Sequence, residues 1–143
     1  MSGSRGGAEL AVGDRFELAK GPVTTRQLVM YAGASGDFNR IHYDLPFAQE
    51  AGLGGVIAHG MLTMGFAAQL MTDWGGPSAL VEKISARFLT PVRPGDTVRL
   101  QGTVTAVEET EGRRRVSVSF EGSTERGRVI AGESRLAFPA QPA

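Results

Sequence analysis

The chain has 143 residues, with 15 lysines and arginines against 15 aspartates and glutamates, two histidines and no cysteine. Its length fits one domain with a single core, and 41% hydrophobic with 21% charged residues is typical of a globular protein, not a disordered one. A formal net charge of zero argues against nucleic-acid binding and gives no support for a membrane-surface role. The lack of cysteine excludes disulfides, thiolate nucleophiles, zinc–thiolate sites and iron–sulfur clusters. Any chemistry must therefore use carboxylates, the two imidazoles, hydroxyls or backbone amides.

Two short tails are expected around one domain. Residues 1–8 are rich in glycine and serine and have no apolar core, so they indicate a flexible tail and not a signal peptide. Residues 139–143 are expected as a second tail, which leaves 9–138 as the domain. The longest nearly apolar run, 56–71, is shorter than the ~20 residues that span a bilayer. We therefore expect a cytoplasmic protein that does not associate with membranes.

The first predicted elements are a strand and a helix. Polar and apolar residues alternate over 15–18, which predicts a short strand. Thr24 begins the capping-box pattern T-T-R-Q, so a helix of about two turns should follow it. This helix is expected to end at Gly33 or Gly36, because glycine is common just after the last helical turn.

A second short helix and a long apolar helix follow. Asp44 is a typical N-cap, and the helix that it begins should end near Gly52. The next run, residues 57–71, is apolar with only scattered polar residues and no polar stripe. A helix that is apolar on all sides must be buried on all sides. In a domain of this size, a curved sheet wrapped around the helix is the simplest way to bury it.

Four strands are predicted after this helix. Apolar and polar residues alternate over 84–88, 98–106 and 116–120, as in strands that are buried on one face. The last strand, about 128–138, alternates less cleanly around residues 131–133, where a bulge would explain the break. With the N-terminal strand this makes an α+β domain, in which a five-stranded antiparallel sheet wraps around one central buried helix. Its open edges suggest a symmetric dimer that pairs two sheets edge to edge.

Asp37, Asn39 and His42 lie in one short loop between two predicted helices. A carboxylate, an amide and an imidazole wedged together suit a reaction site. The spacing D-x-N-x-x-H is also consistent with simple turn formation, because Asp and Asn side chains often bond nearby backbone amides. His42 would then be a hydrogen-bonded loop residue. From spacing alone the two interpretations carry about equal weight.

His59 and Gly60 stand where the long apolar helix is expected to begin. The first amides of a helix have no internal partner, and the helix dipole adds partial positive charge there. Because Gly60 has no side chain, a ligand could approach its N–H closely, so this amide could act as an oxyanion-hole donor. Alternatively, the glycine only relieves crowding against the sheet, and His59 only bonds a neighbouring loop.

The two motifs together resemble one family. Residues 31–44, Y-A-G-A-S-G-D-F-N-R-I-H-Y-D, closely resemble the signature of the MaoC-like (R)-specific enoyl hydratases and dehydratases. Residues 55–65, G-V-I-A-H-G-M-L-T-M-G, look like the entry to the central helix in the same family. The resemblance covers about residues 10–138. The helix entry is especially similar to the catalytic subunit of heterodimeric (3R)-hydroxyacyl-ACP dehydratases.

The resemblance implies a hotdog fold and the interconversion of trans-2-enoyl and (3R)-3-hydroxyacyl thioesters of CoA or ACP, without a metal or organic cofactor. It implies that Asp37 and His42 are the catalytic pair, that Asn39 supports them, and that the N–H of Gly60 forms the oxyanion hole. The partner is expected to be an identical chain or a related hotdog subunit. Three residues around the glycine are expected to support the site or contact substrate: Ala58, His59 and Met61.

Two residues depart from the family pattern. Arg40 stands where the family usually has proline, which loosens the backbone of the loop. Its charge either contacts a pantetheine phosphate or an acidic carrier protein, or is simply solvated. Ala68 stands where some members have a serine on the central helix, so the hydrogen bond of that serine is absent.

Three other functions fit the sequence less well. A hotdog thioesterase would share the fold and the acyl-thioester substrate, but such enzymes lack D-x-N-x-x-H. A non-catalytic subunit that binds acyl chains or supports a partner would not need the catalytic pair. Asp37, His42 and His59 supply the ligand types of a facial-triad iron site. For that site His59 would have to turn toward the loop, and the usual close H-x-D spacing is missing.

Overall fold

The alternating segments form one antiparallel sheet in the computed structural model, which describes residues 10–140. The strands are β1 (Arg15–Lys20), β2 (Leu80–Phe88), β3 (Val98–Thr110), β4 (Arg113–Thr124) and β5 (Gly127–Pro139). The helices are α1 (Thr25–Ser35), α2 (Leu45–Glu50) and α3 (Gly60–Gly75), with one 3-10 turn, η1 (Arg40–His42), before α2. The strands pair in the order β1-β3-β4-β5-β2, so β1 and β2 are the edges. The expected α+β fold, with a five-stranded sheet and one long central helix, is confirmed.

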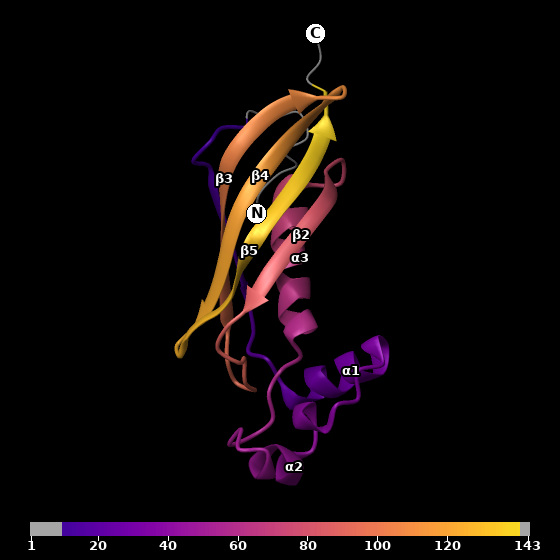
Figure 1. Ribbon diagram of the computed structural model, residues 1–143, viewed down its shortest axis with the longest axis vertical. Coiled ribbons are helices and arrows are strands. Elements are labelled where there is room, and N and C mark those ends of the chain that lie inside the picture. The colour runs from indigo at the N-terminus through magenta and orange to yellow at the C-terminus, as the bar shows by residue number, and fades with distance from the viewer. Residues whose placement is uncertain (1–9, 141–143) are drawn as a thin grey trace.

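Helix α3 lies along the strands on one face of the sheet, whereas α1 and α2 lie beyond one end of the sheet (Figure 1). Trp74, near the end of α3, anchors this packing. Its ring stacks on Phe16 of β1 with centroids 4.2 Å apart and meets Phe138 of β5 edge-on at 5.8 Å. All three side chains are buried, and aromatic rings contribute most to a core because each buries a large apolar area. This cluster fixes the last turns of α3 and leaves its first turn close to η1.

The sheet covers only one side of α3. Met61 is 57% exposed, Gly65 and Thr72 are also exposed, and Met64 and Ala68 are half-buried. These five positions lie on one side of the helix, because 61, 65, 68 and 72 are three or four residues apart and 64 lies beside 65, and we call them the α3 stripe. The expectation that this helix is buried on all sides is therefore wrong for a single chain, because one five-stranded sheet reaches only one face of it.

Local chemistry correctly predicted where α1 begins and ends and where α2 begins. Thr24 Oγ1 accepts the N–H of Gln27 at 3.1 Å and begins α1. Gly36 ends α1 in a left-handed conformation with φ of 75°. Asp44 Oδ1 accepts the N–H of Phe47 at 3.3 Å and begins α2. The loop between the two helices is therefore held at both ends.

The predicted bulge at residues 131–133 is wrong. Pairing of β5 with both of its neighbours is regular there, and the register shift between β4 and β5 lies nearer their turn. Gly132 breaks the alternation for a different reason. A Cβ at this position would overlap the backbone carbonyl oxygen of Ser85 on β2, so the two strands can approach this closely only at a glycine.

The last strand runs to Pro139, one residue beyond the domain boundary expected at 138. The expected tail at residues 1–8 lies outside the described residues, as do residues 141–143. Within residues 10–140, none of the helices is both long and apolar enough to cross a membrane.

Candidate active site

Asp37 and His42 face each other across the turn between α1 and α2. The Oδ2 atom of Asp37 lies 3.8 Å from Nε2 of His42. The other carboxylate oxygen, Oδ1, accepts the N–H of Asn39 at 3.2 Å, and Oδ1 of Asn39 accepts the N–H of Ile41 at 3.2 Å, which caps η1. Turn formation and site formation therefore occur together. One oxygen of Asp37 shapes the turn, and the other is left facing His42.

His42 is buried, and a backbone carbonyl fixes its tautomer. Its Nδ1 lies 2.7 Å from the carbonyl oxygen of Ile57. Because a carbonyl oxygen can only accept a hydrogen bond, Nδ1 carries a proton, and in the neutral ring Nε2 then presents its lone pair toward Asp37. Ile57 also donates its N–H to the carbonyl of Ile41 at 3.1 Å. These two bonds join the turn to the segment that leads into α3, so the two sequence motifs form one site.

His59 packs against His42 and the backbone of Asp37. It is 1% exposed, its Nε2 donates to the carbonyl oxygen of Asp37 at 3.2 Å, and its ring stacks on His42 with centroids 3.7 Å apart. The ring of Tyr31 meets it edge-on at 4.8 Å. Burial lowers the pKa of His59, and the hydrogen bond to Asp37 opposes this less strongly. The imidazole of His59 is therefore neutral near pH 7.

Asp37, His42 and His59 do meet, yet their geometry does not suit a single metal ion. One ligand atom from each residue lies within 4.8 Å of the others, and His59 does turn toward the loop. The lone pair of an imidazole nitrogen lies in the plane of its ring, and these two stacked rings have only 21° between their planes. Their lone pairs lie in two separate, nearly parallel planes, so they do not converge on one point, as the ligands of a facial triad must.

Gly60 is the first residue of α3, and its N–H donates to no other residue in the described part of the chain. An amide at this position can bind an anion or a developing negative charge. The ring of Phe88 on β2 lies 3.3 Å from the place that a Cβ of Gly60 would occupy, so the glycine also relieves crowding. Both interpretations of this glycine are compatible with the structure.

Ala58 and Met61 flank this position and differ in burial. Ala58 is buried, and its N–H donates to the carbonyl of Val92 at 2.8 Å, which ties the start of α3 to the chain after β2. Met61 is 57% exposed at the start of the α3 stripe. Ala58 therefore holds this segment in place through its backbone, whereas the side chain of Met61 is exposed.

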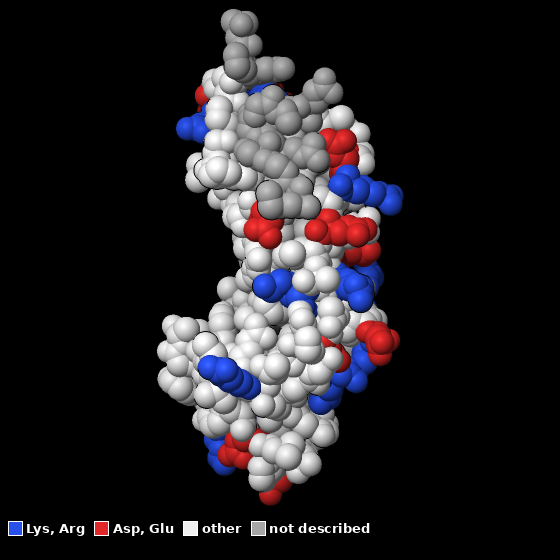
Figure 2. Space-filling model, turned by 180° about the vertical axis from the view of Figure 1, so that it is seen from behind, with Lys and Arg blue, Asp and Glu red and all other residues white. Residues whose placement is uncertain are grey.

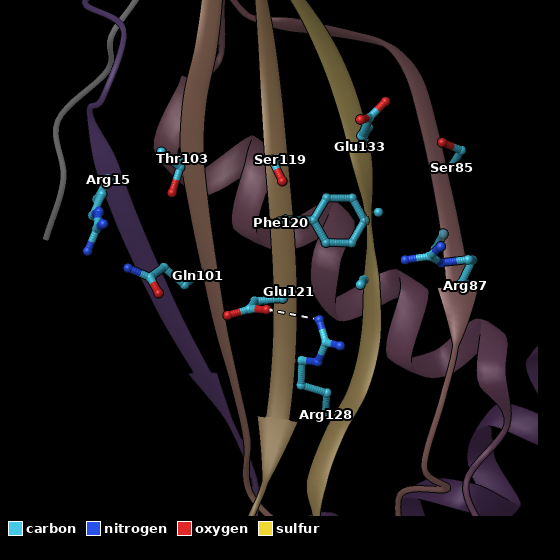
Figure 3. A pocket seen from close by; sticks show the side chains of 13 residues that line it. Arg15, Ser85, Arg87, Gln101, Thr103, Ser119, Phe120, Glu121, Arg128 and Glu133 are labelled. Atoms are coloured by element: carbon cyan, nitrogen blue, oxygen red, sulfur yellow. Dashed lines mark ion pairs between the residues drawn. The ribbon is translucent and has the colours of Figure 1, made fainter.

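A large surface hollow lies away from these residues. It has a volume of about 640 Å³ and lies on the outer face of the sheet, with α3 on the opposite face (Figure 3). None of the expected site residues lines it. Its charged side chains are Arg15, Arg87, Glu121, Arg128 and Glu133. A second, open hollow of about 570 Å³ lies between α1 and the start of α3, where Tyr31 and Leu62 line it. This second hollow borders the site, because Tyr31 also contacts His59.

Three contributions to the site escape sequence reasoning: the carbonyl of Ile57, the ring of Tyr31 and the ring of Phe88. Ile57 acts through its backbone, which leaves no mark on residue type. Phe88 is brought to Gly60 by the sheet, from far along the chain. Tyr31 alone carries a local signal, because it lies on the same helix as the start of the D-x-N-x-x-H loop.

Known proteins are similar to this chain in both sequence and fold. Residues 8–125 match a family model described as "MaoC like domain". The chain is 35% identical over 136 residues to the (R)-specific enoyl-CoA hydratase of Rhodospirillum rubrum, covering 93% of this chain and 91% of that protein. It is 33% identical over 124 residues to the 3-hydroxybutyryl-CoA dehydratase of Methylorubrum extorquens, covering 86% of this chain and 78% of that protein.

A solved structure of the ChsH1–ChsH2 complex from Mycobacterium tuberculosis is similar in fold. The TM-score is 0.83 with 29% sequence identity, and the match covers 91% of this chain and 99% of that one. The family model spans most of the chain, and its range includes Asp37, His42 and Gly60. The chain therefore belongs to the MaoC-like domain family.

Proposed function

We propose that this chain is a hydro-lyase that adds water reversibly to trans-2-enoyl thioesters of CoA or ACP, forming (3R)-3-hydroxyacyl thioesters. The observation that carries the proposal is the pairing of Oδ2 of Asp37 with Nε2 of His42 at 3.8 Å, with the proton of His42 on the opposite nitrogen. Two acceptors that face each other need a donor between them, and a water molecule has two O–H donors. The relatives named for (R)-specific hydration and for dehydration support the same chemistry.

The pair would activate this water for addition to the double bond. As the water oxygen bonds to the β-carbon, one of the pair takes its proton, and the electrons of the double bond move toward the thioester carbonyl. The N–H of Gly60 would stabilise the resulting enolate oxygen. The pair then returns one proton to the α-carbon, so the net change is addition of H and OH. Dehydration is the reverse, and either Asp37 or His42 can hold the proton in transit.

The remaining site residues would hold this pair in place. Asn39 caps η1, and His59 binds the backbone of Asp37 while its ring packs on His42. Each step above uses side chains and one backbone amide of this chain, so we expect turnover to need no cofactor or metal. Dialysis against EDTA should leave the rate unchanged. The cytoplasmic location expected from the sequence stays a prediction.

The direct test follows a short trans-2-enoyl-CoA by the absorbance of its conjugated thioester. We expect the absorbance to fall without release of free thiol, and the product to have the (3R) configuration by chiral analysis. Release of free thiol would favour a hotdog thioesterase. No turnover of CoA or ACP substrates, alone or with a related subunit, would favour a non-catalytic partner. Asp37→Asn, which keeps the turn, is the matched inactive control.

We also propose that the chain works as a dimer, with an identical chain or with a related hotdog subunit. Strand β2 is an edge of the sheet, and Leu80 at its start is 54% exposed. The α3 stripe is uncovered as well. In the view from behind, uncharged surface lies between separate charged groups in the lower half of the molecule (Figure 2). Pairing two sheets edge to edge would cover these surfaces. The similar ChsH1–ChsH2 structure, which is a complex, supports this proposal.

A charge on the α3 stripe tests the dimer. Gly65 is exposed, with nothing within 4 Å of the place of a Cβ, so a single chain should accept Gly65→Glu without loss of fold. We expect sedimentation velocity to show this variant shifted toward monomer. Ser119→Glu, at an exposed position on the outer face of β4, is the matched control and should leave the dimer intact. Equal sedimentation of wild type and both variants would contradict the placement of the interface.

A further inference from the structure

The side chain of Arg40 lies across the turn that carries the catalytic pair. Its Nε and Nη2 both donate to Oδ2 of Asp44, at 3.0 and 2.9 Å. Its guanidinium group also lies over the ring of Phe47, 4.4 Å from the centroid. Asp44 uses its other oxygen to cap α2. One arginine therefore ties the first residue of η1 to the first turn of α2.

These contacts give the charge of Arg40 a partner within the chain, which the sequence alone did not identify. The guanidinium group donates two hydrogen bonds to one carboxylate, and its flat face packs on an aromatic ring. Arginine holds this geometry better than lysine does. The hydrogen bond from Arg40 holds the pKa of Asp44 below its usual range, so the pair stays ionised at neutral pH. Arg40 is thus paired with Asp44 and not simply solvated, although 57% of its side chain stays exposed.

The backbone at this point has the geometry of a proline site. Arg40 is the first residue of η1, and its N–H donates to no other group among the described residues. Asn39 before it has φ of −59° and ψ of 126°, which is the extended conformation that favours a following proline. A proline ring would fix φ near the value that a 3-10 turn needs. Arginine has no such ring, so its side-chain contacts are what residue 40 itself adds to the bonds that hold the turn through Asn39 and Ile57.

We propose that Arg40 is a positioning residue, whose bonds to Asp44 and Phe47 hold η1 in the conformation that points Nε2 of His42 at Asp37. His42 is the last residue of the same short turn, so a small rotation of the turn would move its ring away from the carboxylate. This role rests on the proposed hydratase function, because it acts through the pair assigned to that reaction. It should therefore appear in kcat and not in KM.

Steady-state kinetics with the same enoyl-CoA separates this role from substrate binding. Arg40→Ala should lower kcat about tenfold and change KM less than about twofold, because a misplaced catalytic group slows the chemical step. Arg40→Pro should recover most of the lost kcat, although it has no charge, because it restores only the backbone constraint. A higher KM with unchanged kcat in Arg40→Ala, or an Arg40→Pro enzyme no faster than Arg40→Ala, would overturn the proposal.

A second pair of variants guards against a folding defect. Asp44→Ser keeps a good N-cap for α2 but removes the partner of Arg40, so it should lower kcat as much as Arg40→Ala. The double variant should be no slower than either single variant, because both remove the same contact. Additive losses would overturn the proposal. If Arg40→Ala does not fold, Arg40→Lys gives the same comparison with a smaller loss, because lysine keeps the charge but not the fork.

Histidine NMR tests the same role without any turnover. The chain has two histidines, so imidazole ¹⁵N spectra separate them, and His42 should show the Nδ1–H tautomer in the wild type. Arg40→Ala should shift its signals toward a mixture of tautomers, and Arg40→Pro should restore them. Unchanged His42 signals in Arg40→Ala would overturn the positioning role. The predicted change in a protein that hydrates no enoyl thioester would refute the proposed reaction and leave the positioning of the turn supported.

Discussion

Replacement of Asp37 by asparagine should abolish most turnover without loosening the fold. The side chain of Asp37 is 52% exposed, and its Oδ1 accepts only the N–H of Asn39 among the described contacts. The amide oxygen of asparagine can accept this bond too, so the free energy of unfolding should change by no more than about 0.5 kcal/mol. The new NH₂ group would take the place of Oδ2 and donate to Nε2 of His42. One substitution would thus remove both acceptors from the catalytic water.

The expected loss in kcat/KM is about 10²–10⁴-fold, equivalent to about 3–5 kcal/mol of transition-state stabilisation. His42→Ala should lose a similar factor and also destabilise the fold by about 2 kcal/mol, because the carbonyl of Ile57 loses its donor. The double variant should be little slower than Asp37→Asn alone. Enoyl-CoA kinetics and urea unfolding measure the two quantities separately. Two results would refute the idea that Asp37 and His42 act on one shared water molecule. One is a kcat/KM of Asp37→Asn within about tenfold of wild type, and the other is a double variant whose loss is the product of the single losses.

Three buried or crowded residues give further tests. Folding lowers the pKa of His59, so below the ordinary histidine pKa of about 6.5 the unfolded chain binds more protons than the folded one. The melting temperature should therefore fall as the pH drops below that value, and it should reach its highest level above it. His59→Gln should flatten this dependence, and an equally steep profile in that variant would assign it to another group. Gly60→Ala should lower kcat about tenfold with little change in melting temperature. Adding Phe88→Leu should relieve the crowding without restoring turnover, whereas restored turnover would leave the glycine a packing role only. Gly132→Ala should destabilise the fold by about 3 kcal/mol in urea unfolding, because its Cβ would overlap the carbonyl of Ser85, and an unchanged midpoint would contradict that contact.

Sequence reasoning succeeded where the cause of a structure is local. The caps at Thr24 and Asp44 depend on hydrogen bonds between residues three positions apart. The alternation of polar and apolar residues in β3 and β4 needs only a sheet with one buried face. It failed where the cause lies in another part of the chain. The irregular pattern at Gly132 reflects the approach of β2, and the uncovered face of α3 reflects how far one sheet reaches. Neither is written in the neighbouring residues.

The candidate site divides in the same way. The motifs single out Asp37, His42 and Gly60 as candidates, and the structure brings the first two together. The tautomer of His42 cannot be predicted from its motif, because it depends on the carbonyl of Ile57, which lies 15 residues further along the chain. The partner of Arg40 is only four residues away, yet sequence left it open because arginine at a loop surface has many possible partners.

The groups assigned to catalysis come from one continuous stretch, residues 37–60, which lies toward the end of the sheet occupied by α1 and α2 (Figure 1). Hydrogen bonds from Ala58 to Val92 and from Arg93 to Leu53 tie this stretch to the loop after β2. Strand β4, by contrast, is paired along both of its sides. A stretch held this way can open as a unit while the sheet stays folded. Its amide hydrogens should exchange with solvent sooner than those of β4, and heating should inactivate the enzyme at a lower temperature than the one at which the sheet unfolds.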